Sequence, residues 1–241
     1  MSILRTIAVF LAFVGYLVTR IPHLLWVNRH AAIWPRERYD QVVYRISTRW
    51  ARMVARITGA RFHVSGLHNI PNDRFVLFVS NHQSDLDIII CMSFLPGPKG
   101  FVAKVEMLKV PLLRSWMKHM RCVFMDRKDM KQSLKVILEG IEILKSGHNM
   151  VVFPEGTRSK SPKMLEFKAG AFKLATKSKV DIVPVSISGS YKIFEANHYR
   201  IKPADVYITI HPPLHTAALN AEESAMLPDT VRGIIEQGIT V

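Results

Sequence analysis

The first part of the chain is apolar, but polar residues interrupt it at intervals that are short for a simple membrane span. Residues 3–27 are mostly apolar and are interrupted by Arg5, Arg20, Pro22 and His23. The uninterrupted stretch, residues 6–18, would form a helix of only about 20 Å, whereas the hydrocarbon core of a bilayer is about 30 Å thick. We therefore expect an anchor that dips into one leaflet or crosses at a tilt. A cleaved signal peptide is the alternative, but no small-x-small cleavage site closes the apolar run.

An amphipathic helix is predicted next, from about residue 38 to residue 57. Apolar residues recur there at spacings of three and four, as on one face of a helix: Tyr39, Val42, Val43, Ile46, Trp50, Met53, Val54 and Ile57. A second stripe at the same spacing consists of Arg38, Arg45, Arg49, Arg52 and Arg56. Such a helix can lie on a membrane with its arginines on lipid phosphates. The alternative is a helix that packs on the rest of the protein and leaves its arginines in water. The preceding apolar segment favours the membrane interpretation.

From Arg61 onward the pattern changes from helical to strand-like. Residues 61–65 alternate between polar and apolar, and residues 74–80 form a continuous apolar run. Further strand-like runs lie at 150–153, 181–188 and 206–210, and helical patterns lie between them at 87–94, 131–144 and 167–176. This alternation predicts an α/β fold with a mixed, largely parallel sheet flanked by helices. We expect membrane-associating helices in residues 1–58 and an α/β domain in residues 59–241.

The net charge of the chain limits the classes of partner that we expect. The chain holds 33 Lys and Arg against 19 Asp and Glu, a formal net charge of +14. This surplus favours nucleic acid, an anionic membrane leaflet or a phosphorylated substrate. We do not expect nucleic acid, because aromatic and basic residues are not interleaved as in a single-strand binding groove. The two cysteines, Cys91 and Cys122, exclude a disulfide framework and a four-cysteine zinc site, and we place both in the core or at its margin.

A polar turn connects the apolar run 74–80 to the helix predicted at 87–94. Within it, Ser84 and Asp87 fit a helix capping box, which gives Asp87 a purely structural explanation. Asp87 can also hold one imidazole nitrogen of His82 while the other faces the carboxyl ends of the strands, where ligands of α/β sheets bind. Such a pairing fixes the tautomer of His82 and makes it a general base.

Cations are expected at other strand ends. The segment Phe153-Pro154-Glu155-Gly156-Thr157-Arg158 follows a predicted strand as a Pro/Gly turn, and its guanidinium can bind two oxygens of one phosphate. Arg127 ends another apolar piece, and Lys104 precedes it. Several cations beside one polar turn predict an anionic substrate.

These residues also carry a resemblance. The pattern N-H-x-x-x-x-D at 81–87, F-x-x-R at 124–127, F-P-E-G-T-R at 153–158 and V-P-V at 183–185 resembles, in order and spacing, the four blocks of the glycerolipid acyltransferase family. Within it, the 1-acylglycerol-3-phosphate acyltransferases are the most similar group. The blocks lie between about residues 81 and 189, and the first and third together are specific.

The resemblance implies a reaction. An acyl chain would pass from an acyl thioester, either acyl-coenzyme A or acyl carrier protein, to the sn-2 hydroxyl of 1-acylglycerol-3-phosphate, giving phosphatidic acid without metal or cofactor. The family's roles transfer to His82 as base and Asp87 as its partner, and to acceptor binding by Arg127, Glu155, Gly156, Thr157 and Arg158, with Lys104 as a further phosphate ligand. The resemblance also implies a membrane-associated enzyme that contacts anionic lipids, with its active site on the cytoplasmic face of the inner or cell membrane.

Two positions depart from the family pattern. The second block usually begins with glycine three residues before its Phe, where this chain has Arg121. If Arg121 faces the site, it adds a cation near the headgroup. Asp85 stands where relatives often carry a larger side chain.

Other functions stay open at this stage. The acceptor could be another lysophospholipid. A lipid hydrolase could use the same His–Asp pair on water, and a non-catalytic basic protein could bind a membrane by charge alone. The chain has no G-x-x-x-x-G-K, H-E-x-x-H or G-x-S-x-G motif, which argues against nucleotide hydrolysis, zinc peptidases and serine nucleophile elbows. The donor, the acyl chain length and the oligomeric state are not readable from the sequence.

Overall fold

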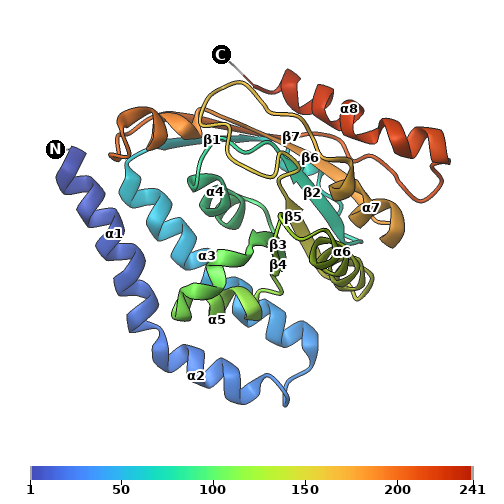
Figure 1. Cartoon of the computed structure of the whole chain (residues 1–241). Helices are drawn as coiled ribbons and strands as arrows, with labels where there is room; N and C mark the ends of the chain where they lie inside the picture. Colours follow the sequence, from blue (N-terminus) through green and yellow to red (C-terminus); the bar gives the residue numbers. More distant parts are fainter. Residues whose placement is uncertain (1, 240–241) are drawn as a thin grey trace.

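A computed structural model describes residues 2–239 of the 241-residue chain, which fold around one seven-stranded sheet (Figure 1). The strands are β1 (Arg61–Ser65), β2 (Val76–Ser80), β3 (Lys99–Lys104), β4 (Val123–Met125), β5 (Asn149–Val152), β6 (Asp181–Ser188) and β7 (Asp205–Ile210). Their order across the sheet is β1-β7-β6-β2-β5-β3-β4. The β6–β7 pair is antiparallel and every other pair is parallel. The sequence-based prediction of a mixed, largely parallel sheet is confirmed.

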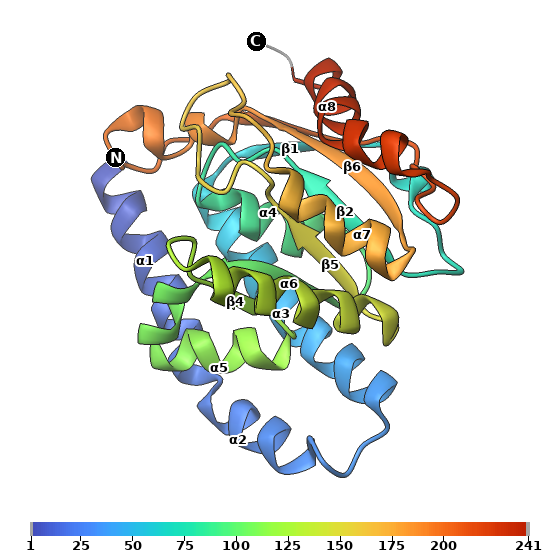
Figure 2. The same ribbon diagram turned by 45° about the vertical axis from the view of Figure 1, so that its right-hand side comes forward.

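Helices cover both faces of the sheet. They are α1 (Ser2–Thr19), α2 (Ile21–His30), α3 (Arg36–Thr58), α4 (Leu86–Phe94), α5 (Pro111–His119), α6 (Met130–Lys145), α7 (Lys173–Ser178) and α8 (Ala221–Gln237). Alternate residues of β2 point to opposite faces: Val76 and Phe78 pack with α3 and α4, whereas Leu77 and Val79 pack with α6, α7 and α8. Helices α1 and α2 lie outside α3 and α5 (Figures 1 and 2).

Helix α3 has the two stripes that its sequence predicts. Its apolar stripe is buried against α4 and α1, with Val43, Trp50 and Val54 in the core, and the five arginines of the other stripe are exposed. The apolar face therefore follows the packing alternative, while the arginine face is exposed, with Nε of Arg52 donating to the carbonyl of Ser93 at 3.0 Å. Helical sequence ends at residue 58 and strand-forming sequence follows it. One hydrophobic core nevertheless contains residues from both sides of this boundary.

Helix α1 presents an apolar face to the outside. It is the one helix within residues 2–239 that is long and apolar enough to cross a membrane, and little of it is buried. Its 18 residues span about 27 Å, longer than the uninterrupted apolar run of residues 6–18 suggests. The exposed apolar side chains are Ile3, Leu4, Ile7, Phe10, Leu11, Val14 and Val18. Such a face indicates membrane association.

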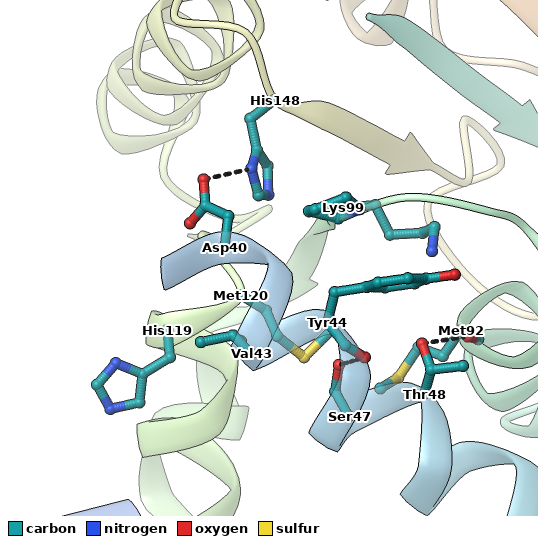
Figure 3. A pocket seen from close by; sticks show the side chains of 11 residues that line it. Asp40, Val43, Tyr44, Ser47, Thr48, Met92, Lys99, His119, Met120 and His148 are labelled. Atoms are coloured by element: carbon teal, nitrogen blue, oxygen red, sulfur yellow. Dashed lines mark hydrogen bonds and ion pairs between the residues drawn. The ribbon is translucent and has the colours of Figure 1, made fainter. Parts of the chain in front are cut away.

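A small polar pocket lies between α3 and the beginning of β3 (Figure 3). The Asp40 carboxylate accepts from Nδ1 of His148 at 3.2 Å. Nearby, the ammonium group of Lys99 is buried over the ring of Tyr44, 4.7 Å from its centroid. Burial lowers the pKa of Lys99 to about 7, and the charge of Arg52 adds to this effect. The two cysteines lie in the core as expected, and burial raises the pKa of both thiols.

The buried Lys99 predicts a pH-dependent stability. Its pKa rises from about 7 in the folded protein to 10.5 on unfolding, so folding must release a proton at every pH between these values. The resulting penalty grows as the pH falls from 10.5 to 7 and is constant below. Lys99→Met should therefore raise the free energy of unfolding at pH 7, and its advantage should shrink by roughly 3 kcal/mol by pH 9.5. Denaturant titrations of both proteins in detergent micelles at the two pH values measure this, and an equal difference at both would contradict it.

Candidate active site

Five parallel strands direct their carboxyl ends to one edge of the sheet. Strands β6, β2, β5, β3 and β4 run in the same direction. The turn with His82 follows β2, the turn with Arg158 follows β5, and Arg127 follows β4. Parallel strands thus bring segments far apart in sequence to the edge where ligands of such sheets bind.

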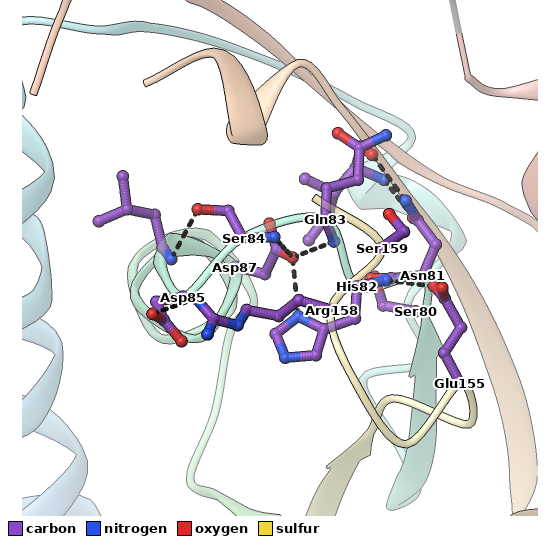
Figure 4. Close-up of polar contacts among 12 residues, drawn as sticks. Ser80, Asn81, His82, Gln83, Ser84, Asp85, Asp87, Glu155, Arg158 and Ser159 are labelled. Carbon is purple, nitrogen blue, oxygen red and sulfur yellow. Dashed lines mark hydrogen bonds and ion pairs between the residues drawn. The ribbon is translucent and has the colours of Figure 1, made fainter. Parts of the chain in front are cut away.

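His82 and Asp87 form a hydrogen-bonded pair at the end of β2 (Figure 4). Nδ1 of His82 lies 2.9 Å from Oδ2 of Asp87. The Asp87 side chain is completely buried, whereas 12% of the His82 side chain is exposed. A carboxylate accepts only, so Nδ1 of His82 donates, and Nε2 of the neutral ring carries a lone pair that points away from Asp87. This is the arrangement of a general base.

Asp87 has a structural task as well. The same Oδ2 accepts from the backbone N–H of Gln83 at 2.6 Å and of Ser84 at 2.8 Å. The bond to Ser84 is the one that the S-x-x-D pattern predicts for its carboxylate, and Oγ of Ser84 accepts from the backbone N–H of Leu86 at 3.1 Å where α4 begins. The structural bonds and the bond to the imidazole therefore share one oxygen atom, so the turn before α4 also orients the imidazole.

Glu155 holds the His82 turn from the other side. Its Oε1 accepts from the backbone N–H of His82 at 2.6 Å, and its Oε2 accepts from that of Leu165 at 2.8 Å. The resemblance assigns Glu155 to acceptor binding, whereas in the structure its carboxylate is buried and faces backbone donors. Burial raises the pKa of Glu155, although these two hydrogen bonds oppose the shift. Its place supports a role in positioning His82.

Further contacts fix the His82 ring and backbone. The imidazole stacks on Phe153 with ring centroids 4.2 Å apart and an interplanar angle of 20°. The carbonyl of His82 accepts from the backbone N–H of Ser159 at 2.8 Å. Asn81 exchanges two 2.8 Å hydrogen bonds with the backbone of Ile187 and so fastens the turn to β6. Sequence reasoning missed this role of Asn81, although the residue begins the pattern N-H-x-x-x-x-D at 81–87.

Arg158 is held by two carboxylates. Its Nη1 donates to Asp85 in a short hydrogen bond and to Oε1 of Glu195 at 3.1 Å. The same Glu195 oxygen accepts from the backbone N–H of Asp85 at 3.0 Å. The Asp85 side chain is 60% exposed, whereas that of Glu195 is 1% exposed. Glu195 is therefore a fixed support for Arg158, and Asp85 is a partner that solvent or a ligand can replace.

Gly156 and Thr157 form the turn between Glu155 and Arg158. Gly156 has φ +73°, and a Cβ there would also lie 3.2 Å from the side chain of Lys168. The position therefore favours glycine for its backbone conformation. Thr157 is exposed at the tip of the turn.

The other predicted cations are on the same edge but apart from the His82 cluster. Lys104 ends β3 and forms an exposed ion pair with Glu106 at 3.3 Å. Arg127 follows β4, three strands from β2, which is about 14 Å at the usual strand spacing. Its side chain is exposed and forms no ion pair with any residue in the range 2–239. It remains available to an anionic ligand.

Arg121 does not face the site. It has φ +59°, and its carbonyl oxygen lies beside Gly100 near the beginning of β3, at the opposite edge of the sheet. Its Nη2 donates to Oγ of Ser146 at 2.8 Å. The left-handed conformation explains why the family pattern has glycine at this position, and Arg121 adds no cation at the carboxyl edge.

No metal-binding cluster appears in the described part of the chain: within residues 2–239, no three His, Cys, Asp or Glu side chains gather in a way that could hold a metal ion. Oδ2 of Asp87 and Nη1 of Arg158 are instead engaged with neighbouring residues of the site. The chemistry that these residues offer is that of a base and a hydrogen-bond donor.

Known proteins are similar to the part of the chain that carries this site. Residues 61–188, more than half of the chain, match the family model Acyltransferase. Human 1-acyl-sn-glycerol-3-phosphate acyltransferase alpha is 35% identical over 177 residues, 72% of this chain and 62% of the human protein. The 1-acyl-sn-glycerol-3-phosphate acyltransferase from Borreliella burgdorferi is 27% identical over 73% of this chain and 70% of the length of that enzyme. The chain thus spans about three fifths of the human relative's length.

A solved structure has the same architecture. The crystal structure of the 1-acyl-sn-glycerophosphate acyltransferase PlsC from Thermotoga maritima superposes with a TM-score of 0.82 at 29% sequence identity. The superposition covers 99% of this chain and 96% of that one. The likeness therefore includes α1 and α2 as well as the α/β domain.

Proposed function

The chain belongs to the acyltransferase family, and we propose that it transfers an acyl chain from an acyl thioester to the sn-2 hydroxyl of 1-acylglycerol-3-phosphate, giving phosphatidic acid. The observation that carries the proposal is the His82–Asp87 pair, with the Nε2 atom of His82 free at the carboxyl edge of the sheet. The names of the human, Borreliella and Thermotoga relatives support the acceptor.

The reaction needs one base and no covalent enzyme intermediate. Nε2 of His82 takes the proton of the sn-2 hydroxyl as the hydroxyl oxygen attacks the thioester carbonyl carbon. Asp87 stabilises the imidazolium that forms, because its carboxylate already accepts from Nδ1. When the tetrahedral intermediate collapses, the C–S bond breaks and the imidazolium returns the proton to the departing thiolate. The products are the ester and a free thiol.

The acceptor phosphate would bind to Arg158. The guanidinium is now held by Asp85 and Glu195, and only Asp85 is exposed enough to be displaced. The phosphate would take the place of the Asp85 carboxylate while Glu195 keeps the arginine in position. Arg127 and Lys104 add positive charge along the same edge, where they attract an anionic headgroup.

The apolar face of α1 would place this edge at a membrane surface. Helix α2 adds the exposed Trp26, and tryptophan is enriched at membrane interfaces. We place the active site on the cytoplasmic face, since all ten cations before Phe62 are arginines and cytoplasmic segments next to membrane helices carry excess Lys and Arg.

The base assignment has a direct test. His82→Ala should lower phosphatidic acid formation by about two to four orders of magnitude, and Asp87→Asn should also lower it strongly. The assay supplies 1-acylglycerol-3-phosphate and a labelled acyl thioester in micelles and measures phosphatidic acid and free fatty acid separately. His68→Ala, an exposed histidine away from the site, is the matched control. Near wild-type activity of His82→Ala would refute the mechanism, and labelled fatty acid as the main product would indicate a hydrolase.

The Arg158 assignment makes two opposite predictions. Arg158→Gln should raise the acceptor KM, because a phosphate ligand is lost. Asp85→Asn should lower the acceptor KM by up to about fivefold, since an exposed ion pair contributes at most about 1 kcal/mol and the phosphate no longer competes with it. The donor KM should change little in both variants. A higher acceptor KM in Asp85→Asn would mean that Asp85 supports the site and does not compete for Arg158.

Membrane binding should depend on the outer face of α1. The variant Leu4→Gln, Phe10→Gln, Leu11→Gln should bind vesicles at least a hundredfold more weakly, because each buried large apolar side chain contributes about 1.5 to 3 kcal/mol. Co-sedimentation with neutral vesicles measures how much the apolar face contributes to membrane binding. Co-sedimentation with anionic vesicles also measures the contribution of the α3 arginines. The matched control replaces Met130, Leu134 and Leu138, exposed on the other face of the protein, by Gln. Unchanged binding of the α1 variant to neutral vesicles would contradict this role of α1.

A further inference from the structure

A lysine that the sequence analysis did not single out lies against the turn at Gly156. A Cβ atom added at Gly156 would lie 3.2 Å from Cε and 3.2 Å from Nζ of Lys168. A residue larger than glycine would therefore crowd the end of this lysine. Lys168 is exposed, and its ammonium group forms no hydrogen bond or ion pair with any residue in the range 2–239. The group is thus free to bind an anion beside the turn.

Backbone hydrogen bonds fix the main chain of Lys168 to the same turn. The backbone N–H of Lys168 donates to the carbonyl of Pro154 at 3.0 Å. Earlier in the same segment, the backbone N–H of Leu165 donates to Oε2 of Glu155 at 2.8 Å. The fold therefore determines where the Lys168 side chain begins, and only its flexible end is left to solvent.

The acceptor site is short of positive charge without this lysine. Nη1 of Arg158 donates to both Asp85 and Glu195, so two carboxylates surround one guanidinium group. If a phosphate displaces the exposed Asp85, the buried Glu195 still offsets the charge of Arg158. A phosphate monoester carries a charge of about −1.5 to −2 at pH 7. It therefore needs a further cation, and the ammonium group of Lys168 is free beside the same turn.

The acceptor phosphate must also bind close to the base. In 1-acylglycerol-3-phosphate, the carbon that carries the phosphate is bonded to the carbon that carries the attacking hydroxyl. Glu155 accepts from the backbone N–H of His82 at 2.6 Å, and Lys168 packs on the residue that follows Glu155. Arg127 instead follows β4, about 14 Å from β2 at the usual strand spacing. Lys168 is thus better placed than Arg127 to meet a phosphate beside His82.

We propose that Lys168 binds the phosphate of the acceptor together with Arg158. The proposal rests on the proposed function and adds the residue that supplies the net positive charge of the phosphate site. The phosphate would lie between the ammonium group of Lys168 and the guanidinium group of Arg158. Gly156 would take part in acceptor binding by leaving room for this ammonium group. An acceptor without a phosphate would gain nothing from Lys168.

The experiment measures steady-state kinetics of the full-length protein in micelles, with 1-acylglycerol-3-phosphate and an acyl thioester. Lys168→Gln should raise the acceptor KM about tenfold or more, because a hydrogen bond between charged groups is lost, and should leave the donor KM within about twofold. Lys168→Arg keeps a cation and should keep the acceptor KM within about threefold. Glycerol 3-phosphate has the headgroup without the acyl chain, so its inhibition constant should rise in Lys168→Gln by the same factor as the acceptor KM.

The matched control is Lys163→Gln, which makes the same charge change at an exposed position of the same segment and should keep both KM values. An unchanged acceptor KM in Lys168→Gln, or an equal increase in Lys163→Gln, would overturn the proposal. Equal losses in Lys168→Gln and Lys168→Arg would also overturn it, because packing and not charge would then matter.

Two further outcomes separate this inference from the proposed function. A higher donor KM in Lys168→Gln, with the acceptor KM unchanged, would assign Lys168 to the donor and overturn the proposal, while phosphatidic acid formation by the wild-type protein would leave the proposed function intact. Failure of the wild-type protein to form phosphatidic acid would overturn both.

Discussion

The active-site edge depends on a carboxylate that is removed from water. Asp87 is completely buried, and a buried carboxylate is costly unless hydrogen-bond donors surround it. Its Oδ2 has three: the backbone N–H groups of Gln83 and Ser84 and the imidazole of His82. Two of these donors belong to the turn itself. If the turn changed shape, the buried Asp87 carboxylate would lose these two hydrogen bonds. The orientation of His82 is thus fixed by folding, before any substrate binds.

The two faces of the sheet carry different outer surfaces. The face with α3, α4 and α5 carries α1 and α2, whose outer surface is apolar, and the other face carries α6, α7 and α8. The carboxyl edge of the sheet borders both layers, so residues from both of them can line a site there. A site in the middle of either face would be accessible from one side only.

The sequence predicts a helix or strand well where its local residue pattern determines it. It predicts one less well where contacts with distant parts of the chain determine it. The continuous runs gave β2, β5, β6 and β7 to within about two residues, whereas β3 was missed because its start, Pro98-Lys99-Gly100, is typical of a hinge. The helix expected at 167–176 begins only at Lys173, after a 3-10 turn. The same limit applies to the site. His82 and Asp87 are five residues apart, so their pairing could be inferred, but Glu195 meets Asp85 and Arg158 only because of the way the chain returns after β6.

Two buried carboxylates of the site differ in role because of what surrounds them. Glu155 faces backbone N–H groups on both oxygens, so it controls where the His82 main chain lies. Asp87 faces the imidazole, so it controls where the ring points and which nitrogen keeps its proton. With Phe153 stacked against the ring, the position, tautomer and tilt of the base are each set by a different neighbour. Loss of Glu155 or Phe153 would remove one of these contacts, whereas the loss of Asp87 would remove the hydrogen bonds to the turn before α4 and the partner of the imidazole together, so Asp87 is the neighbour of His82 that is hardest to replace.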